Sequence, residues 1–301
     1  MNTLVYVVYG QSPYIDEVIY AVLSARTMLD PQSDDCRIVL YTDDAAPFRG
    51  LPAHLEVKSR AEFAEWTGPL CFNHRLKIFA IRDALSQYGD RIIYCDSDTY
   101  FLKSPNQLFS QIRPGTSFMH VCEGHLNESN GAGLADFLNS NELRTAAGRP
   151  WHLMDDALMF NAGVIGMHKD DMGLLDEVVY LTDQIYRHVK IHTVEQFAFS
   201  ACLSRRTRLL EAYDVVCHYW RMPGRALFRE ELRTVLHDPS ITSYEEQWQR
   251  LKPHRPPQSI AHFQESIKER ICSRLRREAK RAGVLDPIRL VLHKVRGSDA
   301  A

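Results

Sequence analysis

The sequence predicts an α/β protein with a mixed, mostly parallel sheet that is flanked by helices. Short apolar runs rich in β-branched and aromatic residues, at residues 4–9, 37–42 and 91–95, have the length and composition of buried strands. Segments with apolar residues at helical spacing, at residues 14–29 and 76–88, separate these runs. Strands and helices that alternate in this way are typical of a parallel sheet with helices on both faces.

Local signals give the bounds of the first elements. Gly10 ends the first strand, and an Asp-Pro pair ends the helix over residues 14–29. The second strand stops at Asp43, and residues 55–57 are expected to form a short third strand. Ligands of parallel sheets bind at the carboxyl ends of the strands. We therefore expect Gly10, Asp43 and Asp96 to lie at one edge of the sheet.

The second half of the chain has a less regular pattern. The elements predicted there are a helix or turn at residues 106–112, strands at 118–122, 158–167 and 215–220, and helices at 172–188 and 194–203. Residues 123–155 are rich in Gly, Asn and Ser and are predicted to be irregular, and a loop of this length is either functional or mobile. Gly163 interrupts a strand, which indicates that a ligand or another backbone segment approaches closely there.

Two aspartates, Asp96 and Asp98, directly follow the strand at residues 91–95. Like charges this close repel each other, and burial makes the repulsion stronger. A divalent cation that prefers oxygen ligands, Mg²⁺ or Mn²⁺, would relieve the repulsion and could hold a diphosphate. The alternative is that Asp96 caps the turn and Asp98 is solvated.

Length and composition limit the classes of protein. The 301 residues suffice for one large α/β domain or two small ones, and 45% hydrophobic and 25% charged residues are ordinary for a globular protein. The N-terminus lacks the pattern of a signal peptide, and no apolar run reaches the length of a membrane span. The seven cysteines include no C-x-x-C pair, which favours reduced thiols and a cytoplasmic location.

The basic residues gather near the C-terminus. Residues 266–301 hold ten Lys and Arg against four Asp and Glu, whereas the net charge of the whole chain is −2. The pattern predicts a basic helix with Ile267, Ile271 and Leu275 on one face, which suits contact with an anionic membrane surface. The alternative is a solvated helix that packs on the body of the protein. Because the basic character is confined to one end, nucleic-acid binding is not expected.

An ordered set of motifs resembles GT-A glycosyltransferases, most closely family 8 and its bacterial relatives. The set spans about three quarters of the chain, and its members are the N-terminal strand, loop and helix, Ile92-Ile93-Tyr94-Cys95-Asp96-Ser97-Asp98, Phe160-Asn161-Ala162-Gly163-Val164, Glu195-Gln196 and His218-Tyr219-Trp220. The resemblance implies a GT-A domain at residues 1–265, followed by the basic tail. It also implies a hexosyltransferase that uses a UDP-sugar, retains the anomeric configuration and acts on a glycan, lipid-linked or protein acceptor.

The resemblance further implies a metal site. Asp96, Asp98 and His218 would hold Mn²⁺, with Mg²⁺ as the alternative, and the ion would bridge the diphosphate of the donor. An imidazole ligand favours Mn²⁺, and the ion offsets the negative charge that builds up on the departing UDP. In the alternative interpretation His218 is a hydrogen-bonded histidine at a strand end, and His262 competes for its role.

The same resemblance implies the contacts of the donor. The uracil base would lie against Tyr9, Gly10 and Tyr14, although the aspartate that many relatives have in this loop is absent. Lys77 is expected to contact the phosphates or the sugar in preference to Arg75. The other donor contacts would come from Ser97, Asn161, Ala162 and Gly163 and, in place of the lysine that follows the late histidine in family 8, from Arg221 or Arg225.

Glu195 and Gln196 resemble an acid–glutamine pair that lies beneath the anomeric carbon in family 8. A double displacement would use Glu195 as the nucleophile. A front-face reaction needs no nucleophile, and Gln196 would then stabilise the developing oxocarbenium charge. The sequence leaves both routes open.

Two other functions stay open at this point. A nucleotide-sugar-binding protein without catalysis would carry the same residues, and only turnover separates it from an enzyme. A phosphatase of the haloacid-dehalogenase type also has a D-x-D motif at a strand tip. In that class the motif normally follows the first strand of the core, whereas Asp96 follows a later one.

Overall fold

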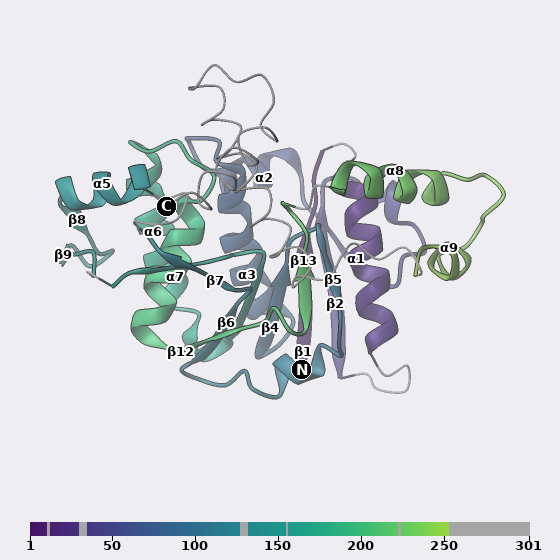
Figure 1. Cartoon of the computed structure of the whole chain (residues 1–301), viewed down its shortest axis with the longest axis horizontal. Helices are drawn as coiled ribbons and strands as arrows, with labels where there is room; N and C mark the ends of the chain where they lie inside the picture. The colour runs from purple at the N-terminus through teal and green to yellow at the C-terminus, as the bar shows by residue number, and fades with distance from the viewer. Residues whose placement is uncertain (11–12, 30–34, 127–131, 155, 222–223, 253–301) are drawn as a thin grey trace, which may run out of the picture. The chain divides into compact units, whose positions relative to one another are not determined.

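A computed structural model describes residues 1–10, 13–29, 35–126, 132–154, 156–221 and 224–252 of the chain. Within these residues the central element is a seven-stranded sheet (Figure 1). In order across the sheet its strands are β12 (Arg208–Glu211), β6 (Thr116–Met119), β11 (Val164–His168), β4 (Arg91–Cys95), β1 (Asn2–Val7), β2 (Cys36–Thr42) and β3 (His54–Val57). All of them run in one direction except β11, which is antiparallel to both of its neighbours. The mostly parallel sheet predicted from the sequence is confirmed.

Successive residues of β1 face opposite sides of the sheet and belong to two different apolar cores. Leu4 and Tyr6 pack in one core with α1 (Tyr14–Met28), and Val5 packs in the other with α3 (Leu76–Gln87). None of these three side chains has exposed surface. Because both faces of the strand are buried, its sequence is a continuous apolar run with no polar alternation.

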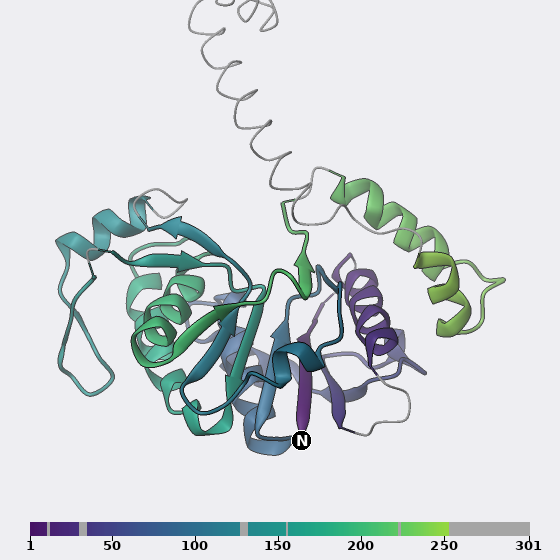
Figure 2. The same cartoon turned by 60° about the horizontal axis from the view of Figure 1, so that its bottom comes forward.

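Helices cover both faces of the sheet, as both views of the domain show (Figures 1 and 2). One core includes side chains of α3, α6 (Leu174–Tyr186) and α7 (Val194–Arg206), and α2 (Arg60–Thr67) contacts α3. The other core includes side chains of α1, α4 (Asn106–Phe109), α8 (Arg225–Leu236) and α9 (Tyr244–Leu251). Among the helices of the described residues, none combines the length and the apolar character that crossing a membrane requires.

Short strand pairs lie outside the main sheet, and two of them join distant parts of the chain. The antiparallel pairs are β5 (Thr99–Phe101) with β13 (Val216–His218), β7 (Cys122–His125) with β10 (Leu158–Phe160), and β8 (Leu143–Arg144) with β9 (Pro150–Trp151). Single 3₁₀ turns lie at Ala46–Phe48, Asn73–Arg75 and Lys169–Asp171. The first pair places His218 directly opposite Thr99. A histidine far along the chain therefore lies beside the turn that follows β4.

The structure corrects two predictions about the second half of the chain. The segment predicted to be irregular, residues 123–155, includes α5 (Ala132–Ser140) and the strands β7, β8 and β9 in its described part. Leu134, Leu138 and Trp151 of this segment are buried in the core, and this apolar spacing was hidden among Gly, Asn and Ser. The predicted strand at residues 158–167 is two strands, β10 and β11, separated by the turn at residues 161–163.

Besides α5, the helices α2, α8 and α9 were not predicted. For α2 the sequence carries a usable signal, a capping box. The Ser59 hydroxyl accepts a hydrogen bond from the Glu62 backbone N–H at 3.2 Å, and the Glu62 carboxylate accepts one from the Ser59 backbone N–H at 2.7 Å. The predicted basic helix of the tail, the domain boundary at residue 265 and His262 all lie outside the described residues.

Candidate active site

A cavity of about 570 Å³ opens at the carboxyl ends of β1 and β4. The predicted site residues that line it are Tyr9, Tyr14, Lys77, Asp96, Ser97, Asp98, Asn161, Ala162, Gly163, Glu195, Gln196, His218 and Arg225. Gly10 and Arg221 do not belong to the lining. The backbone N–H of Gly10 donates to Asp43 Oδ1 at 3.0 Å, so these two strand ends meet as predicted.

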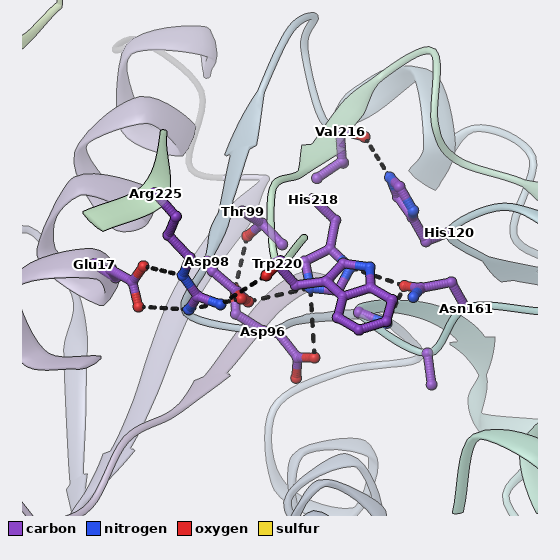
Figure 3. A network of polar contacts seen from close by, with 12 residues as sticks. Glu17, Asp96, Asp98, Thr99, His120, Asn161, Val216, His218, Trp220 and Arg225 are labelled. Carbon is purple, nitrogen blue, oxygen red and sulfur yellow. Dashed lines mark hydrogen bonds and ion pairs between the residues drawn. The ribbon is translucent and has the colours of Figure 1, made fainter. Parts of the chain in front are cut away.

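Three side chains with metal-binding atoms meet in this cavity (Figure 3). One ligand atom from each of Asp96, Asp98 and His218 lies within 4.8 Å of the others. The backbone holds both aspartates in place: the N–H of Asp96 donates to the Gly163 carbonyl at 2.8 Å, and the Asp98 carbonyl accepts from Tyr219 at 3.0 Å. The arrangement predicted for a metal site is therefore present in the fold.

The amide of Asn161 determines which nitrogen of His218 carries a proton. Asn161 Oδ1 accepts from the backbone N–H of Gly163 at 2.9 Å and lies 2.8 Å from His218 Nδ1. Because Oδ1 can only accept, Nδ1 must donate, and in the neutral ring Nε2 keeps its lone pair. Nε2 lies 3.1 Å from Oδ1 of Asp98, within hydrogen-bond distance, and 4.0 Å from Oδ2 of Asp96. In the neutral ring, Nε2 and the two carboxylates would offer their electron pairs to a cation.

Gly163 provides the space for the His218 ring. A Cβ atom at Gly163 would lie 2.1 Å from His218 Nδ1 and 2.3 Å from Cε1, far inside contact distance. The close approach predicted at this glycine is confirmed. The sequence predicted that a ligand or a backbone segment approaches this glycine. In the structure the approaching group is the imidazole of His218.

Arg225 adds a positive charge beside Asp98. Its Nη2 lies 2.8 Å from Asp98 Oδ2, and its guanidinium also forms a paired contact with Glu17, at 2.8 Å for each bond (Figure 3). Burial acts to raise the pKa of Asp98, but His218 and Arg225 outweigh it and hold the pKa below its ordinary value. The Asp98 carboxylate is therefore ionised and available to a cation at neutral pH.

Lys77 lies between two carboxylates in the floor of the cavity. Its Nζ is 3.1 Å from Asp96 Oδ1, 3.4 Å from Glu195 Oε1 and 3.1 Å from the Ala162 carbonyl. The residue is only 4% exposed. Burial acts to lower the pKa of Lys77, but Asp96 and Glu195 outweigh it, so the pKa is raised. Lys77 is therefore charged and holds both acids in position.

The two basic residues weighed as alternatives have other contacts. Arg75 forms a two-bond ion pair with Asp183, at 2.8 and 3.0 Å, away from the cavity lining. The guanidinium of Arg221 lies 4.0 Å from the centre of the Trp220 ring. Of the two arginines that could replace the family 8 lysine, Arg225 is the one in the cavity.

Glu195 and Gln196 differ in how their side chains are used. Oε2 of Glu195 has no hydrogen-bond partner in the part of the chain that the structure describes, although the residue is only 2% exposed. In contrast, the amide of Gln196 accepts from Ala162 N at 3.3 Å and donates to Glu123 at 2.9 Å. Glu123 also accepts from Asn161 Nδ2 at 3.1 Å. Glu195 is the acid with an oxygen free for another group.

Sequence reasoning missed several residues of the site. Glu123 lies in no motif and Glu17 is an unremarkable acid of the N-terminal helix, so only their contacts in the folded chain mark them. The lining residues that were not predicted as site residues are Val7, Val8, Asn73, His74, Leu76, His192, Thr193 and Trp220. The ring of His192 lies beside those of His74 and Trp220, with centroids 6.1 and 6.4 Å away.

The two tyrosines predicted for the base have different surroundings. The ring of Tyr9 stacks on Phe63 of α2, with centroids 5.2 Å apart. Tyr14 is half exposed, and the guanidinium of Arg229 lies 5.4 Å from the centre of its ring. Both rings line the cavity, as a base-stacking role requires.

Comparison with known proteins identifies the fold. No protein-family model matches the sequence, and no curated protein matches it. Among solved structures, the galactosyltransferase LgtC in complex with donor and acceptor sugar analogues aligns with a TM-score of 0.53 at 14% identity, over 82% of this chain and 99% of LgtC. The chain has the fold of this enzyme, the GT-A fold that the sequence predicts.

Two larger glycosyltransferases align less well. The bifunctional enzyme WbbM matches with a TM-score of 0.42 at 13% identity, and GlyE from Streptococcus pneumoniae TIGR4 with 0.42 at 15%. Each alignment covers 70% of this chain. The chain spans 38% of the length of WbbM and 45% of that of GlyE.

Proposed function

We propose that the protein is a glycosyltransferase that moves a hexose from a UDP-sugar to an acceptor with the help of a divalent metal ion. The meeting of Asp96, Asp98 and His218 in a cavity at the strand ends of a GT-A sheet carries the proposal. LgtC, which shares the fold, is a galactosyltransferase that was solved with donor and acceptor sugar analogues. Since one fold hosts several functions, the site has to support the assignment.

The residues of the site fit a metal ion. Two carboxylates and an imidazole whose Nε2 faces Asp98 form a mixed oxygen and nitrogen donor set, which favours Mn²⁺ over Mg²⁺. When bound, the ion would offset the negative charge on the departing diphosphate. Asn161 orients the His218 ring for this role, and Gly163 makes room for it.

Arg225 and Lys77 would contact different parts of the donor. Arg225 reaches into the cavity next to Asp98, and because Nε and Nη2 are engaged by Glu17 and Asp98, a hydrogen of Nη1 would contact a phosphate. Lys77 lies deeper, beside Asp96 and Glu195, where it would contact the sugar or the adjacent phosphate. Tyr9 and Tyr14 would stack against the base.

Glu195 is the best placed group for the reacting carbon. Its Oε1 is held by Lys77, and its buried Oε2 has no partner among the described residues. A carboxylate in this state suits the stabilisation of positive charge on the sugar, or a covalent displacement with retention. Gln196, which is hydrogen-bonded to Ala162 and Glu123, would hold the segment around Ala162 in position against the donor.

The sequence predictions support two assignments, one for acceptor choice and one for location in the cell. We assign residues 123–155 to acceptor choice, and of these Glu123 bonds Gln196. The basic tail at residues 266–301 would hold the enzyme at the inner face of a membrane. Both assignments depend on the glycosyltransferase function.

Calorimetric titration of UDP, with Mn²⁺ and again with EDTA, tests the proposal. We expect binding that requires the metal, and its loss in Asp98→Asn. Screening of UDP-sugars for hydrolysis would then identify the donor. Metal-independent binding, or no binding of UDP in either condition, would contradict the proposed function.

A further inference from the structure

A buried carboxylate of α1 lies behind the metal site. Glu17 is 0% exposed and faces two arginines one turn apart on α8. Arg225 bonds it through Nε and Nη2, both at 2.8 Å, and Arg229 bonds it through the same two atoms at 3.1 and 2.9 Å. Both oxygens of Glu17 therefore accept from both guanidinium groups.

Arg225 also contacts Asp98 of the metal site. Nη2 of Arg225 carries two hydrogens and lies 2.8 Å from Glu17 Oε2 and 2.8 Å from Asp98 Oδ2 (Figure 3). Among the described residues, Arg229 forms an ion pair with Glu17 and none with Asp98. Charge neutralisation of Glu17 needs one cation only. The ion pair between Glu17 and Arg225 therefore affects Asp98, whereas the ion pair between Glu17 and Arg229 does not.

The contact with Glu17 limits how Arg225 can bind Asp98. Its Nε and Nη2 bond Glu17 and its Nη1 donates to the Trp220 carbonyl at 3.3 Å, and the contact with Asp98 is between Nη2 and Oδ2 at 2.8 Å. The other oxygen, Oδ1, stays on the side of His218 Nε2 at 3.1 Å. An arginine released from Glu17 would take both oxygens of the aspartate, because a guanidinium fork matches a carboxylate in that geometry.

We propose that Glu17 is a positioning residue that holds Arg225 on one oxygen of Asp98 and so keeps the other oxygen available to the metal ion. The inference rests on the proposed function, since it assumes that Asp98 is a metal ligand. It assigns a role to a residue of the N-terminal helix that the sequence did not mark as part of the site. Glu17 acts through Arg225 and would itself contact neither the ion nor the donor.

Calorimetric titration of Mn²⁺ alone into the full chain tests the inference without any sugar transfer. Glu17→Gln should weaken Mn²⁺ binding about tenfold, the size typical of residues that orient metal ligands. The matched control is Asp16→Asn. Asp16 is the neighbouring buried acid of α1 and pairs with His237 at the other end of α8, at 3.0 Å, so its loss disturbs the same helix contact without touching Arg225. We expect wild-type Mn²⁺ affinity in this control.

Two double variants separate positioning from charge and from folding. Glu17→Gln with Arg229→Gln restores the net charge of the buried cluster, which protects folding, and should still bind Mn²⁺ about tenfold more weakly than wild type. Glu17→Gln with Arg225→Gln removes the released arginine and should recover most of the affinity. Thermal unfolding of each variant reports its folding.

Three results would overturn the inference. These are wild-type Mn²⁺ affinity in Glu17→Gln, equal weakening in Asp16→Asn, and full recovery when Arg229 is replaced together with Glu17. In each case the wild-type protein still binds Mn²⁺, so the proposed metal site stands. A wild-type protein that binds no Mn²⁺ contradicts the metal site itself, and the role of Glu17 with it.

Discussion

Oδ1 of Asn161 lies 2.8 Å from Nδ1 of His218, and this contact turns Nε2 of the ring towards Asp96 and Asp98. The same oxygen is held by the backbone N–H of Gly163, so the amide cannot rotate without the loss of a second bond. The ring and its supporting amide therefore act as one unit. Such support is a regular feature of metal-binding histidines.

The first prediction concerns this support. Asn161→Leu keeps the approximate size of the side chain but leaves His218 Nδ1 without an acceptor, and we expect Mn²⁺ affinity to fall about 10- to 100-fold. Asn161→Asp keeps an acceptor oxygen and should lose less. Calorimetric titration of Mn²⁺ measures both. Equal affinity in Asn161→Leu and wild type would show that the tautomer of His218 does not depend on this amide.

Gly163 and Gly166 offer a matched pair for the second prediction. Alanine at 163 would place Cβ 2.1 Å from His218 Nδ1 and force the ring out of position. Alanine at 166 would meet Ile112 and Phe118 at 3.1 Å, a tight contact in the core that does not involve the metal site. We expect both variants to lower the melting temperature.

Only Gly163→Ala should also abolish Mn²⁺ binding, because only there does the new methyl group displace a metal ligand. Melting temperature and Mn²⁺ affinity, measured on the same samples, separate the two effects. Normal Mn²⁺ affinity in Gly163→Ala would mean that His218 can move without loss of the site.

The third prediction separates Arg225 from Arg221. Only Arg225 lines the cavity, whereas the Arg221 guanidinium lies over Trp220. In the presence of saturating Mn²⁺, Arg225→Gln should weaken UDP binding at least tenfold, as expected for the loss of a charged hydrogen bond to a phosphate worth about 1.5–3 kcal/mol. Arg221→Gln should change it less than about threefold. The reverse order of effects would assign the diphosphate to Arg221.

Local patterns predicted the framework of the site. The apolar run of β4 and the two acids after it place Asp96 and Asp98 at a strand end, and this depends on neighbours in sequence only. The central strands β1, β2 and β4 were predictable for the same reason. The position of His218 needed the resemblance to a family, because its contact with Asp98 joins residues 120 positions apart.

What local patterns could not show depends on tertiary contacts. In the sequence Glu17 is an ordinary acid in the first turn of a helix, where its negative charge interacts favourably with the helix dipole. Its burial between two arginines 208 and 212 residues later is a property of how α1 packs against α8. The sequence marks Gly163 as a position of close approach, but the side chain that fills the space there, His218, lies 55 residues further along the chain.

A fourth prediction concerns the N-terminus of α2, the helix that carries Phe63 under the ring of Tyr9. The backbone N–H of Ser59 and its hydroxyl both donate to Glu62, each at 2.7 Å, and these bonds lower the pKa of Glu62 from its ordinary value of 4.5. The folded state thus binds the proton of Glu62 more weakly than the unfolded state does. The stabilisation by the ionised group is fully present above about pH 4.5 and is lost as the pH falls through the lower folded pKa.

Glu62→Gln should therefore melt below wild type at pH 7, and the difference in melting temperature should shrink as the pH is lowered towards 3. Glu65→Gln, an exposed acid of the same helix outside the capping box, serves as the control and should show a smaller effect at pH 7. In an NMR titration of the carboxyl groups, Ser59→Ala should raise the pKa of Glu62, because it removes the hydroxyl donor. A pKa of Glu62 that does not move in Ser59→Ala, or a melting difference that grows as the pH falls, would contradict the role of the capping box.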